Sequence, residues 1–231
     1  MQNSSDDARK PIIAILGGTG KEGRGLAYRW VKAGYHVIIG SRNYEKAQRA
    51  VNILKESIGN VTNIEGNVNI KAADAAEILV LTVPYKAHKS ILERLKSNLE
   101  GKVLIDVTVP IMPPQITVVQ MPPEGSAAQE AQKILGDNVQ VISAFHNISY
   151  EKLLNNNNIE YDVLVCGGTK ESKSKVLQLV EDAGLTGWDA GPIENSVVTE
   201  GLTSILLGIN KKFGTHTAGI KITGVSHSIR K

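Results

Sequence analysis

Residues 12–23 read IIAILGGTGKEG, in which a short apolar run rich in β-branched residues leads directly into a glycine-rich turn. Gly18, Gly20 and Gly23 have the spacing G-x-G-x-x-G, and a helical pattern follows over residues 25–33. In a strand–turn–helix unit the first glycine allows the tight turn, the second lets the backbone approach a pyrophosphate, and the third lets the helix pack against the strand. The stretch therefore predicts a dinucleotide-binding site, and the alternative is a structural turn without a ligand.

The next predicted strand, residues 36–40, indicates which dinucleotide binds. It ends in Ser41 and Arg42, and Lys46 follows one helical turn later. An NAD-binding unit usually has Asp or Glu here for the ribose 2′-hydroxyl, whereas a 2′-phosphate is bound by a hydroxyl group and a cation. The pattern predicts NADP(H). The alternative is a solvated basic helix start, but cations at that end of a helix oppose its dipole and need another reason to be there.

Strands and helices alternate along most of the chain, which predicts a Rossmann-like doubly wound parallel sheet of the α/β class. We expect an NADP-binding Rossmann domain over residues 11–145 and a smaller C-terminal α/β domain over residues 146–231. The expected strands are residues 12–16, 36–40, 61–64, 77–83, 102–107, 139–144, 161–165 and 187–190. The expected helices are residues 21–33, 44–57, 72–76, 86–98, 126–135, 171–182 and 196–212.

Composition and charge argue against several classes of function. The net charge of +3, from 26 basic and 23 acidic residues, is too mild to indicate a nucleic-acid or membrane surface, and two Phe offer little for base stacking. The single cysteine, Cys166, cannot form an internal disulfide, and no Cys/His cluster has metal-ligand spacing. A cytoplasmic protein without a metal is expected. The polar residues 1–10 lack a signal-peptide core, and we expect them to form a flexible tail.

Two later segments have more than one interpretation. Residues 110–125 contain five prolines and predict a long loop, which is either a lid or a rigid connector. The last predicted helix has an apolar stripe at helical spacing, formed by Val198, Leu202, Ile205, Leu206 and Ile209. This stripe is either core or the interface of a symmetric homodimer.

Seven short motifs spread over nearly the whole chain resemble those of one family. They are LGGTG at residues 16–20, GSR at 40–42 with Lys46, LTVPY at 81–85, SAFH at 143–146, VCG at 165–167, DAGP at 189–192 and GIKI at 219–222. The set is similar to the NADPH-dependent coenzyme F420 reductases, also called F420H2:NADP oxidoreductases. Parts of it also look like pyrroline-carboxylate reductases and membrane ferric-reductase domains.

The resemblance implies hydride transfer between C4 of the nicotinamide and C5 of a 5-deazaflavin. Both reactive atoms belong to cofactors, so the protein contributes position, stacking and electrostatics. For NADP(H), the resemblance implies a pyrophosphate site lined by Thr19, Gly20, Lys21 and Glu22, a 2′-phosphate site of Ser41, Arg42 and Lys46, and a ribose site bordered by Thr82, Pro84 and Tyr85. The charged pair of Lys21 and Glu22 departs from the smaller or neutral residues expected in this turn.

For the deazaflavin, the resemblance implies a site near the start of the C-terminal domain, which would close over it. His146 and Ile148 follow a predicted strand end and would lie beside the nicotinamide and deazaflavin rings as the candidate catalytic residues. Asn195, Thr203 and Leu206 are weaker candidates for covering the deazaflavin. The structural alternatives are that His146 is only a hydrogen-bonding residue and that Leu206 is only core.

Two other functions remain open from the residues alone, because dinucleotide-binding domains serve many purposes. A reductase of a small imine or ketone needs a general acid near the nicotinamide, and Tyr85 and His146 are the candidates. A non-enzymatic NADPH-sensing module needs no second pocket. The segment after Ser149 distinguishes these hypotheses, since an enzyme needs it to close a second pocket over the nicotinamide.

Overall fold

The computed structural model describes residues 9–59, 61–154 and 159–225. Most of the predicted flexible tail, residues 1–8, lies outside the described residues. Arg9 and Lys10, the last two residues of that tail, contact the body of the protein: Arg9 pairs with Glu77, and Lys10 donates to the carbonyl of Ala33.

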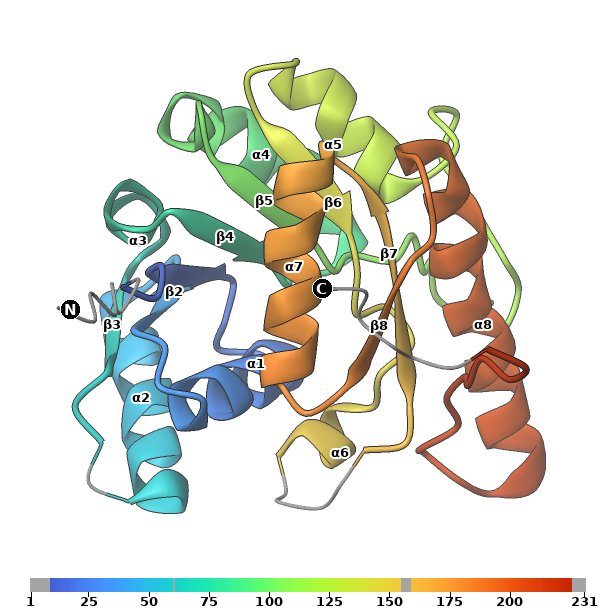
Figure 1. Ribbon diagram of the computed structural model, residues 1–231, viewed down its shortest axis with the longest axis horizontal. Helices are drawn as coiled ribbons and strands as arrows, with labels where there is room; N and C mark the ends of the chain where they lie inside the picture. The colour runs from blue at the N-terminus through green and yellow to red at the C-terminus, as the bar shows by residue number, and fades with distance from the viewer. Residues whose placement is uncertain (1–8, 60, 155–158, 226–231) are drawn as a thin grey trace, which may run out of the picture.

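A single eight-stranded sheet organises the molecule, with the strand order β3-β2-β1-β4-β5-β6-β7-β8 (Figure 1). The strands are β1 (Ile13–Leu16), β2 (Val37–Ser41), β3 (Ile64–Val68), β4 (Ile78–Leu81), β5 (Val103–Asp106), β6 (Gln140–Ser143), β7 (Asp162–Gly167) and β8 (Thr186–Asp189). The helices are α1 (Lys21–Lys32), α2 (Tyr44–Ile58), α3 (Asn69–Ala75), α4 (Tyr85–Leu99), α5 (Ala127–Leu135), α6 (Tyr150–Leu153), α7 (Lys170–Asp182) and α8 (Ser196–Phe213). The predicted Rossmann-like α/β class is confirmed.

One strand pair departs from the predicted parallel arrangement. In the order β3-β2-β1-β4-β5-β6, each pair of neighbouring strands is parallel. Strand β7 then pairs antiparallel with β6, and β8 pairs parallel with β7. The described residues of the connection from β6 to β7, 144–154 and 159–161, contain only the single-turn helix α6, whereas a parallel pair would need a longer crossover helix. Only two residue pairs join these strands, Ile142 with Gly167 and Ser143 with Cys166, so most of β7 extends beyond the end of β6.

The two faces of the sheet are covered by separate groups of helices. The core on one face is built with residues of α1, α2, α6 and α7, and the core on the other with residues of α3, α4 and α5. The central strands β1 and β4 are buried along their whole length, as their continuous apolar sequences predict. Trp30 of α1 ties the first core together, because its ring meets Phe145 edge-on and its indole N–H donates to Leu179 of α7 at 2.9 Å.

One predicted strand is displaced along the chain, and the predicted long loop is present. The strand expected at residues 61–64 is in fact β3, and it begins where residues 61–64 end. Its position is set by pairing with β2, in which Val37 lies opposite Ile64, because its own sequence is too polar to mark a strand. The predicted loop at residues 110–125 is confirmed as a long stretch without helix or strand.

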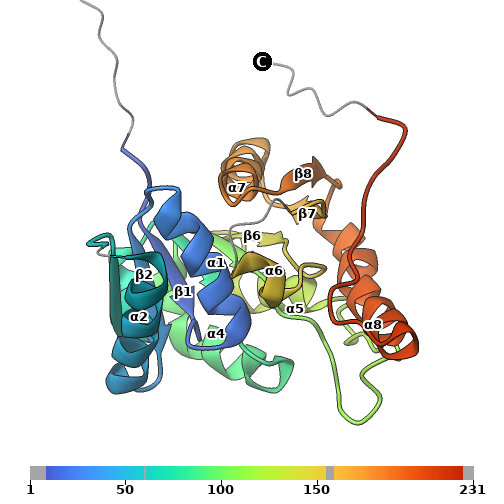
Figure 2. The same ribbon diagram turned by 90° about the horizontal axis from the view of Figure 1, so that it is seen from below.

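Helix α8 stands at the opposite side of the molecule from α2 (Figure 2). Of its predicted apolar stripe, Leu206 is buried, but Val198, Ile205 and Ile209 are 62%, 50% and 41% exposed. The core interpretation is therefore wrong for these three residues, because α8 packs inward mainly through polar residues such as Thr199, Glu200 and Ser204. No helix formed by the described residues is long and apolar enough to cross a membrane.

Candidate active site

The glycine-rich turn between β1 and α1 has the close contacts that its sequence predicts, but a different glycine from the predicted one makes the tight turn. The left-handed backbone conformation falls on Gly17, at φ +73, and not on Gly18. Gly18 is required for space, because a Cβ there would lie 2.7 Å from the carbonyl oxygen of Ile15. A Cβ on Gly23 would lie 2.7 Å from the Gly18 Cα, which confirms close packing of helix on turn. A Cβ on Gly20 would meet only the carbonyl oxygen of Gly17, at 3.9 Å, so a ligand can approach its backbone.

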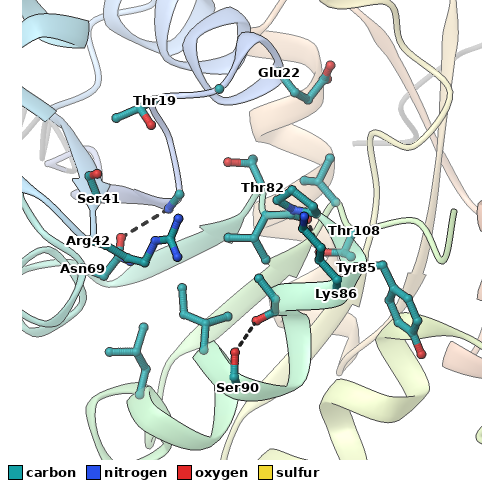
Figure 3. Close-up of a pocket in the computed structure, with 18 of the residues that line it drawn as sticks. Thr19, Glu22, Ser41, Arg42, Asn69, Thr82, Tyr85, Lys86, Ser90 and Thr108 are labelled. Carbon is teal, nitrogen blue, oxygen red and sulfur yellow. Dashed lines mark hydrogen bonds between the residues drawn. The ribbon is translucent and has the colours of Figure 1, made fainter. Parts of the chain in front are cut away.

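A cavity of about 1580 Å³ opens at the C-terminal edge of the parallel strands, in front of this turn (Figure 3). Ten of the residues predicted to bind NADP(H) line it: Thr19, Gly20, Lys21, Glu22, Ser41, Arg42, Lys46, Thr82, Pro84 and Tyr85. Gly18 and Gly23 support the turn from behind. Parallel strands that end at one edge place their following loops together, and ligands of open α/β sheets bind there.

The basic end of the cavity is prepared for an anion. Ser41 ends β2 and is buried, while Arg42 and Lys46 are exposed. The side chain of Asn43 accepts from the backbone N–H of Lys46 at 3.0 Å and so fixes the start of α2. Within the part of the chain that the structure describes, no carboxylate pairs with Arg42 or Lys46. Two unpaired cations beside a hydroxyl group are the set that a phosphate monoester needs.

Asn69 is a functional candidate that sequence reasoning missed. Its side-chain oxygen accepts from the backbone N–H of Gly17 at 3.2 Å, and it lines the cavity at the same end as Arg42 (Figure 3). A Cβ on Gly40 would lie 2.7 Å from the same oxygen, so Gly40 makes room for this contact. The available signal was a polar residue at the end of an edge strand, which is too common to single out.

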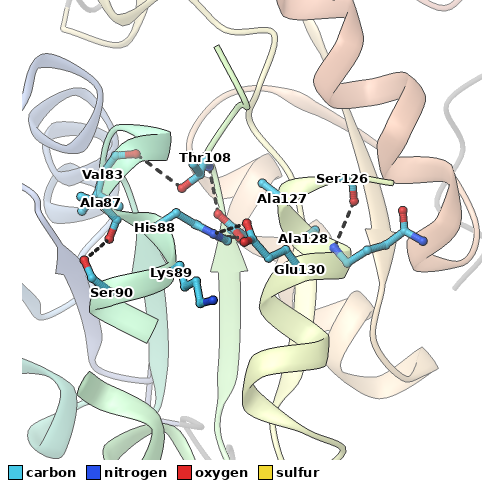
Figure 4. Close-up of polar contacts among 12 residues, drawn as sticks. Val83, Ala87, His88, Lys89, Ser90, Thr108, Ser126, Ala127, Ala128 and Glu130 are labelled. Atoms are coloured by element: carbon cyan, nitrogen blue, oxygen red, sulfur yellow. Dashed lines mark hydrogen bonds and ion pairs between the residues drawn. The ribbon is translucent and has the colours of Figure 1, made fainter. Parts of the chain in front are cut away.

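Below the cavity, a buried group of ionisable residues joins α4 to β5 and α5 (Figure 4). His88 is fully buried, with its Nε2 at 2.7 Å from Asp106 Oδ2 and its Nδ1 at 3.2 Å from Glu130 Oε2. The second oxygen of Asp106 accepts from the backbone N–H of Thr108 at 2.9 Å. The group therefore fixes the first turns of α4, which begins at Tyr85, against the end of β5.

The charges in this group support one another. Burial alone would lower the pKa of His88, but the carboxylates of Asp106 and Glu130 raise it above its usual value. Burial would likewise raise the pKa of Asp106, but the His88 imidazolium and the hydrogen bonds from Thr108 lower it. Burial, with added repulsion from Asp106, raises the pKa of nearby Glu200 to about 8. Glu200 accepts from the first two backbone N–H groups of α5 and so links α8 to that helix.

A second cavity, of about 730 Å³, lies between α6 and α8 and adjoins the first. The predicted residues His146, Ile148, Thr203 and Leu206 line it. The fifth, Asn195, is not among the lining residues of either cavity; its side chain donates to the carbonyl of Ala190 at 2.7 Å. Glu22 lines both cavities, and the proline-rich loop borders both, with Pro113 on the first and Pro114 on the second.

His146 is held neutral at the wall of the second cavity. Its backbone carbonyl accepts from the Thr203 hydroxyl at 2.9 Å, while neither ring nitrogen has a hydrogen-bond partner among the described residues. Burial lowers its pKa to about 4, against a smaller opposing effect of Asp106. The preceding residue, Phe145, adopts φ 66, a strained conformation for a bulky residue, and its packing on Trp30 holds that turn.

Comparison with known proteins identifies the family of this chain. The family described as "NADP oxidoreductase coenzyme F420-dependent" matches residues 12–110. The F420-dependent NADP reductase of Methanocaldococcus jannaschii is 37% identical over 221 residues, covering 92% of this chain and 98% of the relative. This chain belongs to the F420-dependent NADP oxidoreductase family. The reductase of Methanothermobacter marburgensis is 38% identical, with the same coverage of both chains.

The fold of this F420-dependent NADP oxidoreductase family member also matches solved structures. A protein assigned as an F420-dependent NADP-reductase from Arthrobacter sp. FB24 superposes with a TM-score of 0.78 at 21% identity. The match covers 93% of this chain and 100% of that one, so the C-terminal part with its reversed strand belongs to the shared fold.

Removing the Asp106 carboxylate should destabilise the oxidoreductase. We expect Asp106→Asn to lower the free energy of unfolding by about 3–5 kcal/mol near pH 6, since it leaves the buried His88 without its closest partner. The pKa of His88 is raised in the folded protein. The stabilisation that protonated His88 gives to the folded state is therefore complete below its pKa in the unfolded chain, about 6.5, and is lost as the pH rises through its pKa in the folded protein. The loss of unfolding free energy caused by Asp106→Asn should therefore be smaller at high pH.

Urea unfolding at about pH 6 and pH 9 measures this difference. The matched control is Glu65→Gln, which removes the partner of a half-buried histidine, His36, and should change stability by less than about 0.5 kcal/mol. A cost for Asp106→Asn as small as that of the control would contradict a charged pair at His88.

Proposed function

We propose that this member of the F420-dependent NADP oxidoreductase family transfers hydride between NADP(H) and coenzyme F420, with NADP(H) in the first cavity and the deazaflavin in the second. The observation that carries the proposal is the junction of two cavities at Glu22 and the proline-rich loop. Two flat ring systems bound on either side of that junction lie within reach of each other. When bound, they supply the carbon that gives the hydride and the carbon that receives it.

In this proposal the first cavity orients NADP(H) from its phosphate end. Arg42, Lys46 and Ser41 bind the 2′-phosphate, and the free N–H groups at the start of α1 bind the pyrophosphate beside Thr19 and Gly20. Thr82, Pro84 and Tyr85 then border the nicotinamide ribose at the ends of β4 and α4. The buried pair of His88 and Asp106 keeps that border in place.

The second cavity holds the deazaflavin by shape and by neutral contacts. Ile148 and Leu206 supply apolar surface, and Thr203 fixes the backbone of His146. A neutral His146 donates or accepts a hydrogen bond without placing a charge beside the rings. The segment after Ser149, through α6 and α8, excludes water from this side, as the enzyme hypothesis expects and a sensing module does not require.

A reductase of imines or ketones has weaker support. Its two predicted general acids are poorly matched to proton donation near neutral pH, since efficient donors have pKa values close to the working pH. Burial, with the neighbouring Glu130 carboxylate, raises the pKa of Tyr85 to about 12. The pKa of His146, at about 4, lies well below neutral pH.

The assembly and location are further parts of the proposal. The exposed apolar residues of α8, including Val198, Ile205 and Phe213, support a homodimer formed through this helix. Light scattering of the purified protein tests this, and a monomer at micromolar concentration would contradict it. The buried free thiol of Cys166 suits a reducing compartment such as the cytoplasm.

The function is tested by mixing the protein with oxidised coenzyme F420 and either NADPH or NADH. Loss of deazaflavin absorbance should be rapid with NADPH and slow with NADH, because only NADPH has the phosphate that Arg42 and Lys46 bind. Retained NADPH binding without any loss of absorbance would exclude F420 as the second substrate.

Arg42→Ala should weaken NADPH binding by about 1.5–3 kcal/mol and leave NADH binding nearly unchanged, because it removes one charge-assisted hydrogen bond to the 2′-phosphate. Calorimetric titration with each nucleotide measures both values. The control is Arg49→Ala, an exposed arginine of α2 that does not line the cavity. Equal weakening of both nucleotides by Arg42→Ala would remove the 2′-phosphate assignment.

His146→Ala should lower turnover more than it weakens NADPH binding, because His146 lies in the second cavity and not in the first. Steady-state kinetics with F420, together with NADPH titration, separates the two effects. His36→Ala, which replaces a half-buried histidine just before β2 that lines neither cavity, serves as the control. Unchanged turnover in His146→Ala would mean that this histidine is structural.

A further inference from the structure

Glu22 occupies an unusual position for an acidic residue. It lies in the first turn of α1, within the phosphate-binding turn, and lines both cavities. Figure 3 shows its side chain pointing away from Ser41, Arg42 and Asn69 at the basic end of the first cavity. Its Oε1 is buried and has no hydrogen-bond partner among the described residues. The residue as a whole is half-buried, and the unpartnered buried oxygen destabilises the ionised carboxylate, which favours protonation or contact with a ligand.

The surrounding charges do not neutralise Glu22. Lys21, its neighbour, is engaged elsewhere, with its Nζ at 2.9 Å from the Tyr150 hydroxyl, and the buried Nε of Arg24 on the next turn has no partner among the described residues. The other ionisable residues of the second cavity are His146, Tyr150, Glu151, Lys211 and His216. Among the residues that the structure describes, none forms an ion pair with Glu22. Burial therefore dominates and raises its pKa to about 8.

The junction of the cavities is also where the charge of the ligands changes. An oxidised nicotinamide ring is a cation and a reduced one is uncharged, whereas the phosphates keep their charge in both forms. A carboxyl group at the junction therefore meets a different field in each state. A nearby cation favours the carboxylate, and its loss favours the acid.

We propose that Glu22 holds the proton that accompanies hydride transfer, as a neutral acid beside NADPH and as a carboxylate beside NADP⁺. This inference rests on the proposed function. It assigns Glu22 a role beyond lining the pyrophosphate, and it gives a reason for the charged residue in this turn.

The step balances in protons and electrons. The hydride leaves C4 of the nicotinamide with its bonding electron pair and forms a C–H bond at C5 of the deazaflavin. Hydride addition alone leaves the ring system as an anion, and one proton taken up at a ring nitrogen gives the neutral dihydrodeazaflavin. The O–H bond of Glu22 breaks to supply this proton, and its electron pair stays on the carboxylate, which faces the new positive charge. Glu22 regains a proton from water when NADPH replaces NADP⁺.

The test counts protons on binding, without turnover. Calorimetric titration of NADP⁺ and of NADPH, in two buffers of different ionisation enthalpy, gives the protons released by each nucleotide between about pH 6 and 9. Protons lost by the 2′-phosphate are common to both and cancel in the difference. NADP⁺ should release more than NADPH, by up to about one proton. Its affinity relative to NADPH should rise with pH, by up to about tenfold per pH unit below about 8.

Variants assign the proton to one residue. Glu22→Gln keeps the shape of the side chain and should abolish the difference between the nucleotides, and Glu22→Leu, which leaves no orphaned polar atom, should do the same. Glu151→Gln removes an exposed carboxylate of the same cavity and should leave the difference intact. His146 does not titrate in this range, since its pKa is about 4.

Two results would overturn the inference: equal proton release by NADP⁺ and NADPH in the natural protein over the whole range, or a difference that persists in Glu22→Gln. Failure of the proposed function is distinguishable from both. In that case the natural protein would not bind NADPH, or would bind it and not reduce F420, whatever the proton count.

Discussion

Parallel pairing of β1 with β2 on one side and with β4 on the other is the constraint on which the site depends. It brings the ends of three strands to one edge, so that the glycine-rich turn, Ser41 and Thr82 face a common space although they are far apart in sequence. The backbone of the turn is then fixed from both sides: Gly18 donates to the carbonyl of Gly40, and the Thr82 hydroxyl donates to that of Leu16. A shift of one strand by one residue would separate these groups.

A second constraint comes from polar residues buried beneath that edge. His88, Asp106, Glu130 and Glu200 are costly to bury singly, but each lies against a charge or against free backbone N–H groups. The arrangement ties α4, β5, α5 and α8 together, and α4 lines the first cavity while α8 lines the second. Apolar packing alone allows sliding, whereas directional hydrogen bonds in a low-dielectric interior fix one arrangement.

Local patterns in the sequence were sufficient for the first half of the site. The glycine spacing and the pair of Ser41 and Arg42 lie next to apolar strands, so both position and chemistry could be predicted without the structure. The second cavity was harder to predict from the sequence, because its walls come from α6, α8 and a loop, and none of these has a strict sequence pattern. His146 and Thr203, which the resemblance named, line the second cavity, while Asn195 lines neither cavity. Asp106 and Glu200 were missed because a lone acidic residue within an apolar segment does not reveal its partner.

The two strand pairs that join β6 to β7 have a consequence for how such enzymes diversify. Most of β7 extends past the end of β6, toward α6 (Figure 1), and the second cavity is lined by residues of α6 and α8 that do not line the first. Substitutions in α6 or α8 can therefore reshape the second cavity while the first keeps its geometry. The two cavities can thus diverge separately within one fold.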